Sequence, residues 1–127
     1  NTLQDQGEKV FYQACLEGIA FTEAMVFDLI RSLGGTTKGS LFAMGGTTKS
    51  SIGLQIRADV HQKILTIPAH PNSAFGAAIL AAAGYNHQSV AEASKAMVQI
   101  DHHIHPRSKY EDFYKSKYQE FLAFFSK

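Results

Sequence analysis

The sequence predicts an α/β protein in which helices outnumber the strands of a short parallel sheet. Apolar residues recur at helical spacing over most of the 127 residues. Only two short segments, 40–44 and 63–67, carry the apolar and β-branched runs that are typical of strands. A glycine-rich turn and a helical segment separate these two strands, which is the pattern of a parallel crossover.

The remaining elements follow from periodicity and capping signals. The first helical segment ends at Gly34 and Gly35, whose tolerance of positive φ suits a C-terminal cap, and it forms one helix or two joined near Gly18. Ser89 with Glu92 three residues later predicts a capping box. The segment 101–106 is expected to be extended. The predicted helices are 3–33, 52–61, 74–83, 89–98 and 108–125.

The predicted sheet is small for this number of helices. Parallel sheets are stable when both of their faces are covered, and two strands of about five residues form little sheet to cover. The chain also begins with Asn1 rather than Met and enters a helical pattern within a few residues. Either it has been processed or it begins in mid-protein, and we expect further strands to lie upstream of Asn1.

Composition narrows the class of protein. A hydrophobic content of 45%, a charged content of 18% and a formal net charge of +1 are typical of a soluble globular protein without a nucleic-acid-binding surface. The longest apolar stretch, Ala74–Ala83, is too short to span a membrane, so no membrane partner is expected. Cys15 lies in an apolar helical pattern and is predicted to be buried and inert. A single cysteine fits a reducing cytoplasm.

Histidines and aromatic residues are candidates for other sites. Asp101, His103 and His105 share one face of an extended segment, but three ligands so close together rarely converge on one ion, so we interpret this segment as an exposed linker between helices. The aromatic stripe of 108–125 is expected to pack on the body of the domain. Apolar surface left over could favour a homo-oligomer. Other histidines at element ends are expected to be solvated or capping: His61, His70 and His87.

The clearest chemical signal is the glycine turn between the first strand and the second helix. Gly45 and Gly46 let ligand atoms approach the main chain, and the helix that follows offers unpaired N–H groups and a dipole that favours an anion. Hydroxyl groups of Thr47 and Ser50 add donors. The alternative hypothesis is a tight strand-to-helix turn with a Thr or Ser cap and no ligand.

This turn is not a P-loop. That motif requires glycine immediately before the lysine, and Thr48 precedes Lys49 here. A near copy of the turn, Gly34–Lys38, lies eleven residues upstream of Gly45–Lys49. It follows a helix and precedes a strand, which is the wrong context for an anion at a helix start, so we interpret it as capping chemistry.

Four blocks of sequence resemble, in the same order, segments of the FGGY family of carbohydrate kinases, which includes enzymes similar to xylulokinase, gluconokinase and glycerol kinase. The second block contains the glycine turn, and the last precedes a proline and a tyrosine-rich helix, as in that family. Together the blocks span nearly all of the chain: Val10–Phe21, Met44–Val60, Pro71–Tyr85 and Val90–Val98.

The resemblance implies a fold and an activity. Members of the family have two ribonuclease H-like (actin-like ATPase) domains and transfer the γ-phosphate of ATP, with Mg²⁺, to a sugar or polyol hydroxyl. Residues 1–127 would be the C-terminal portion of the C-terminal, nucleotide-binding domain, with the upstream strands and the N-terminal sugar domain absent. Which sugar is phosphorylated stays open, and a non-catalytic nucleotide-sensing, sugar-sensing or interaction module is the alternative function.

The resemblance also assigns site residues. Gly45 and Gly46 would line the nucleotide through their backbones, Thr47 would lie beside them, and Ser50 takes a position where some members place an asparagine near the adenine. The catalytic base, the sugar-binding residues and most carboxylates that organise Mg²⁺ would lie upstream, so no catalytic or metal residue is assigned here. Asp59 is expected to make a structural hydrogen bond or salt bridge. The chain alone is expected to be inactive.

Overall fold

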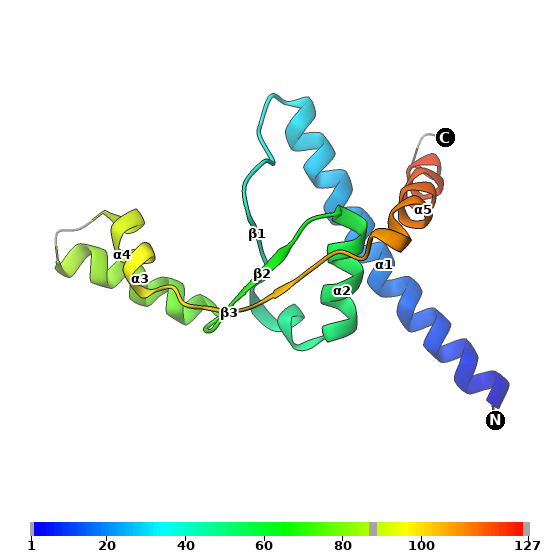
Figure 1. Ribbon diagram of the computed structural model, residues 1–127, viewed down its shortest axis with the longest axis horizontal. Coiled ribbons are helices and arrows are strands. Elements are labelled where there is room, and N and C mark those ends of the chain that lie inside the picture. Colours follow the sequence, from blue (N-terminus) through cyan, green and yellow to red (C-terminus); the bar gives the residue numbers. More distant parts are fainter. Residues whose placement is uncertain (1, 87–88, 126–127) are drawn as a thin grey trace.

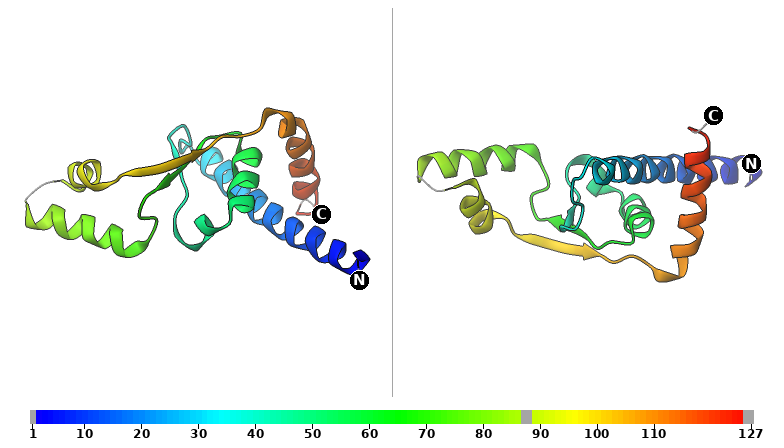
Figure 2. Two further views of the ribbon diagram at one scale, coloured as in Figure 1. Left: turned by 60° about the horizontal axis from the view of Figure 1, so that its bottom comes forward. Right: turned by 90° about the horizontal axis from the view of Figure 1, so that it is seen from above.

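The structure is a computed structural model that describes residues 2–86 and 89–125. Figure 1 shows its helices and strands, and Figure 2 adds two further views. Each predicted helix is present with bounds within a few residues of those expected. In chain order the elements are α1 (Thr2–Ser32), β1 (Leu41–Phe42), the 3₁₀ helix η1 (Gly45–Lys49), α2 (Ser51–His61), β2 (Leu65–Pro68), α3 (Ser73–Tyr85), α4 (Val90–Met97), β3 (Ile100–Ile104), the 3₁₀ helix η2 (Ser108–Tyr110) and α5 (Glu111–Ala123).

The strands of the described residues form one sheet in the order β1-β2-β3. β1 is parallel to β2, with Leu41 opposite Leu65, which confirms the predicted crossover. β3 is antiparallel to β2, with Thr66 opposite His103, so the sheet is mixed. The expectation that 101–106 is extended is confirmed over 101–104, whereas the interpretation of this segment as a linker beside a purely parallel sheet was wrong. β3 was not recognised as a strand because its side chains are largely exposed and polar, although pairing satisfies the free edge of β2.

The sheet packs on α2. Leu54 and Ala58 of α2 and Leu65 and Ile67 of β2 are buried in one apolar cluster, which Ala43 after β1 completes. α2 is the helix of the crossover that connects β1 to β2. Burial of its apolar face against the sheet therefore holds the two strands side by side. This packing fixes the ends of the two parallel strands, where the glycine turn lies.

A second cluster joins α1, α2 and α5. Phe21 of α1 is 6% exposed, and its ring centroid lies 5.5 Å from that of Phe121, 5.9 Å from that of Tyr118 and 6.3 Å from that of Tyr114. Ile56 of α2 completes the contact. The prediction that the aromatic stripe packs on the body of the domain is therefore confirmed for its central residues. The outer members Phe113 and Phe125 are exposed.

The helices α3 and α4 form a separate hairpin. Ile79, Ala83 and Ala93 make a small cluster between them. Figures 1 and 2 show this hairpin projecting from one end of the molecule, away from α1 and α5. Ser89 and Glu92 form the predicted capping box at the start of α4, which is thereby confirmed.

α1 is one continuous helix, and Gly34 with φ of 85° ends it as predicted. The amide of Gly35 donates to the carbonyl of Ile30 at 2.9 Å. Cys15 is exposed, so the prediction of a buried thiol was wrong. The N-terminal half of α1 extends past α2 (Figure 1), and its apolar residues there lack the neighbour that the helical pattern implied.

The stretch Gln6–Ser32 of α1 has the length and hydropathy of a helix able to cross a membrane, a property that the prediction from Ala74–Ala83 overlooked. It is mostly exposed in this structure. Two of its carboxylates, Glu23 and Asp28, bond to side chains of α2 and α5 respectively. Because α1 also buries Ala20 and Phe21 against α2 and α5, we interpret it as a helix of this domain.

Candidate functional site

The glycine turn begins where β1 ends. Gly45 has φ of 76°, a conformation that side chains other than glycine rarely adopt. The chain then closes into η1, in which the Thr48 hydroxyl donates to the carbonyl of Gly45 at 2.8 Å and the Thr47 hydroxyl donates to the carbonyl of Met44 at 3.2 Å. The two threonine hydroxyls therefore hold the shape of the turn.

Ser50 connects the turn to α2. Its hydroxyl oxygen accepts from the amide of Gly53 at 3.1 Å, which makes Ser50 the N-cap of α2. A Cβ built on Gly53 would lie 3.1 Å from that oxygen, so the glycine allows the close approach. The capping role uses an acceptor lone pair of the Ser50 hydroxyl and leaves its proton free to donate.

The loop after β2 lies against the glycine turn. Since β1 and β2 are parallel, their carboxyl ends meet at one edge of the sheet. There the amide of Gly45 donates to the carbonyl of Pro71 at 2.6 Å. The Asn72 side chain then caps α3 by accepting from the amide of Phe75 at 2.9 Å. Both α2 and α3 thus begin at this edge, which is where open α/β sheets bind ligands.

The two glycines present an open surface. Both are exposed, and a Cβ built on either would meet no atom of the described residues within 4 Å. Gly45 requires glycine for its positive φ, whereas the backbone of Gly46 does not adopt such a conformation. The space above Gly46 is therefore open, and a side chain there would occupy it without distorting the fold.

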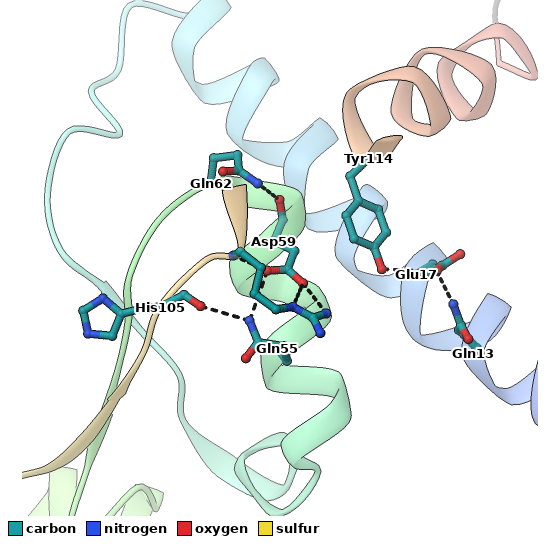
Figure 3. A network of polar contacts seen from close by, with 8 residues as sticks. Gln13, Glu17, Gln55, Asp59, Gln62, His105 and Tyr114 are labelled. Atoms are coloured by element: carbon teal, nitrogen blue, oxygen red, sulfur yellow. Dashed lines mark hydrogen bonds and ion pairs between the residues drawn. The ribbon is translucent and has the colours of Figure 1, made fainter. Parts of the chain in front are cut away.

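A buried polar network lies at the other end of α2 (Figure 3). The Asp59 carboxylate is fully buried and accepts from the Arg107 amide at 2.7 Å, from Arg107 Nη2 at 2.6 Å and from Gln55 Nε2 at 3.0 Å. Gln55 also donates to the carbonyl of His105 at 2.9 Å. The structural role predicted for Asp59 is confirmed: it anchors the connection between β3 and α5. Arg107 was not identified from the sequence, because nothing local links it to Asp59.

A second polar cluster joins α1 to α2. Arg57 donates to Glu23 at 2.6 and 2.9 Å, and the His61 ring lies 3.0 Å from the same carboxylate. Burial alone would raise the pKa of Glu23, but hydrogen bonds from His61 and Arg57 and their charges lower it to about 2. The His61 side chain is only 5% exposed, so the expectation of a solvated or capping histidine was wrong there. His70 is exposed, and His87 lies outside the described residues.

The histidines of β3 make separate contacts. The His102 ring lies 2.6 Å from the Asp101 carboxylate, while His103 Nδ1 lies 3.2 Å from the Thr66 hydroxyl. Within 2–86 and 89–125, no group of three or more potential metal ligands comes together. The side chains of His102 and His103 therefore contact different neighbours and do not converge on one metal centre.

Comparison with known proteins gives consistent matches. The model of the C-terminal domain of the FGGY family of carbohydrate kinases matches residues 2–85. A xylulose kinase of Staphylococcus epidermidis is 28% identical over 119 residues, covering 91% of this chain and 23% of the relative. A human FGGY carbohydrate kinase domain-containing protein is 29% identical over 115 residues, covering 89% of this chain and 21% of the relative.

Comparison with solved structures points to the same family of kinases. A xylulose kinase from Rhodospirillum rubrum superposes with a TM-score of 0.70 at 28% identity, and a xyloylose kinase from Brucella ovis with 0.74 at 26% identity. Each match covers 87% of this chain and 23% of the solved chain. These likenesses confirm the predicted fold class, part of an actin-like ATPase domain rich in helices. The chain spans less than a quarter of the length of the relatives it matches.

Proposed function

This chain belongs to the FGGY family of carbohydrate kinases, and from that premise we propose that it is the nucleotide-binding part of an ATP-dependent kinase. The parent enzyme transfers the γ-phosphate of ATP to a hydroxyl of a sugar or polyol. In our proposal, residues 1–127 form the C-terminal portion of the nucleotide-binding domain. The rest of that domain and the sugar-binding domain belong to the parent chain.

The open glycine turn carries this proposal. Gly45 and Gly46 lie exposed at the edge where β1 and β2 end and where α2 and α3 begin. Unpaired amides at helix starts, together with the helix dipoles, favour phosphate oxygens at such an edge. We propose that the backbones of Gly45 and Gly46 contact the nucleotide and that Thr47 lies beside them. The Ser50 hydroxyl donates its free proton to the adenosine.

The groups at this edge suit phosphates rather than the metal. They are amides and hydroxyls, whereas Mg²⁺ prefers carboxylate and water oxygens in near-octahedral geometry. We therefore propose that residues beyond this chain organise most of the Mg²⁺ coordination. When bound, MgATP supplies the phosphoryl group. Because transfer needs positioning, a metal ion and a base together, the chain alone does not catalyse it.

The exposed face of α1 fits a piece of a larger enzyme. Phe11 and Ile19 are 72% and 56% exposed, and Val26, on the same side of the helix, is 47% exposed. We propose that the remainder of the kinase covers this apolar face, as contiguous exposed apolar surface usually marks a contact. We also place the parent enzyme in the cytoplasm, since its relatives are sugar kinases and the exposed free thiol of Cys15 fits a reducing compartment.

Calorimetric titration of the chain with MgADP tests the assignment. The chain is expected to bind saturably, and Gly46→Val to abolish binding because its side chain fills space meant for the nucleotide. Gly84→Val is the matched control: it too is exposed and meets no atom within 4 Å, and it lies near the end of α3, whereas the turn lies by the start of that helix. Binding that survives Gly46→Val, or no binding by a chain that circular dichroism shows to be folded, counts against a nucleotide on this turn.

A further inference from the structure

A cavity of about 450 Å³ lies at the end of the sheet opposite the glycine turn. Lys38 and Ser40 before β1, Lys63 before β2, and His103 and His105 at the end of β3 line it. Because β3 is antiparallel to β2, its end meets the beginnings of β1 and β2, which brings these residues from three segments together. Figure 3 shows the His105 ring on the side of β3 away from Gln55 and Asp59.

The polar groups of the lining are mostly basic, and Leu41 and Ile64 add apolar wall. The lining carries the ammonium groups of Lys38 and Lys63 and the imidazoles of His103 and His105. In the part of the chain that the structure describes, no carboxylate lines the cavity. The nearest acid of β3, Asp101, is engaged by His102. Lys63 donates one of its three protons to the carbonyl of Thr37, which leaves two for a ligand.

The upstream copy of the glycine turn builds one wall. Lys38 is its last residue, and the carbonyl of Thr37 holds Lys63 in place. The Thr37 hydroxyl in turn accepts from Arg31 at 2.9 Å, which ties this wall to the end of α1. The floor is polar as well, because the Thr66 hydroxyl lies 3.2 Å from His103 Nδ1.

We propose that this cavity is a second anion site, which binds a phosphate dianion or the phosphate group of a small ester. Two ammonium groups and two imidazoles around one cavity match a doubly charged oxyanion that accepts several charge-assisted hydrogen bonds. The volume of about 450 Å³ also accommodates a sugar-sized body beside the phosphate. The site is separate from the glycine turn and does not rest on the proposed nucleotide function.

A protein partner is a poorer fit for this cavity than for the face of α1. The α1 face is apolar, as a buried protein contact requires, whereas an uncharged segment over the cavity would bury the charges of Lys38 and Lys63 without a partner of opposite charge. An anion instead neutralises them. The chemistry of the lining therefore selects a small dianion.

Nuclear magnetic resonance titration of the chain with inorganic phosphate tests the proposal, with chloride holding the ionic strength constant. Amide signals of Lys38 and Lys63 and ring signals of His103 and His105 are expected to shift saturably. Lys38→Gln is expected to weaken binding about tenfold, the equivalent of one charge-assisted hydrogen bond. Lys49→Gln is the matched control, since Lys49 ends the other copy of the same pentapeptide, and it should leave affinity unchanged.

A second arm uses ribose 5-phosphate with ribose as its neutral control. Tighter binding of the ester than of inorganic phosphate identifies a phosphorylated sugar, and equal binding identifies free phosphate. Both results support the site. Shifts confined to residues 45–50, equal losses in Lys38→Gln and Lys49→Gln, or a Lys38→Gln protein that binds as the parent does would each overturn it. Gly46→Val should leave these shifts intact, so the two proposals fail separately.

Discussion

Replacing Asp59 by alanine is expected to destabilise the chain by about 3 kcal/mol, the lower end of the range for breaking a buried ion pair. The carboxylate is fully buried and accepts hydrogen bonds from Gln55 and from the backbone and side chain of Arg107. Removing it leaves the Arg107 amide unpaired, which adds to the cost. The Arg107 side chain is 44% exposed, so its charge can reach water, and this limits the loss.

Urea unfolding followed by far-ultraviolet circular dichroism measures the effect. With a denaturant slope of about 2 kcal/mol per molar, typical of a small domain, the midpoint is expected to fall by about 1.5 M. Lys117→Ala is the control, because it breaks an ion pair with Glu120 at 2.8 Å whose partners are both exposed, and such pairs contribute less than about 1 kcal/mol.

A double-mutant cycle sharpens the test. Arg107→Ala leaves a buried carboxylate without its cation and should cost about as much as Asp59→Ala. The double variant should therefore cost clearly less than the sum of the two single variants. Additive losses, or an Asp59→Ala loss no larger than that of Lys117→Ala, would refute the claim that this pair anchors the connection between β3 and α5.

Two further predictions concern the packing of α1. The folded-state pKa of Glu23, about 2, lies below the ordinary value of 4.5, so its ion pair adds stability above pH 4.5 that is lost as pH falls toward 2. After allowance for partial exposure, we expect the free energy of unfolding to fall by about 2 kcal/mol between pH 4.5 and pH 2, measured from urea midpoints. Glu23→Gln should reduce this dependence on pH, and a dependence that is the same in the variant would contradict the prediction. Phe21→Ala should cost about 3 kcal/mol because three aromatic rings of α5 surround that buried side chain, whereas Phe113→Ala, 48% exposed, should cost less than about 1 kcal/mol by the same assay. Equal losses for the two would show that α5 does not pack on α1 as described.

Local signals account for the elements that were predicted well. The capping box of Ser89 and Glu92 and the glycine that ends α1 depend only on residues within one turn, so they can be recognised without knowledge of the fold. The segment of β3 could be expected to be extended, but its place in the sheet could not be found in this way. Its pairing with β2 is non-local, and its residues Asp101, His102 and His103 lack the apolar alternation that identifies a half-buried strand.

Errors of burial have a related cause. A helical pattern shows which residues are apolar but not whether a neighbour covers them. Cys15 lies on a helix of 31 residues, whereas α2, the helix beside it, has only 11, so part of α1 has no cover. For His61 the error was the opposite one: the side chain was expected to be solvated but is buried, because its partner Glu23 lies 38 positions away in the sequence. The residues of the glycine turn could be located from the sequence, whereas their assignment to a nucleotide stays a proposal.

The two copies of Gly-Gly-Thr-Thr-Lys show why context decides the chemistry of a motif. Gly45–Lys49 follows β1 at the edge where α2 and α3 begin, and helix starts favour anions. Gly34–Lys38 precedes the same strand, so it has no helix start to offer, and Gly34 serves to end α1. What the first copy contributes instead is a carbonyl that positions Lys63 and the side chain of Lys38. In our two proposals, the same five residues thus serve a nucleotide at one end of β1 and contribute one cation, Lys38, at the other. If both proposals hold, Gly46→Val and Lys38→Gln should each remove one anion and spare the other.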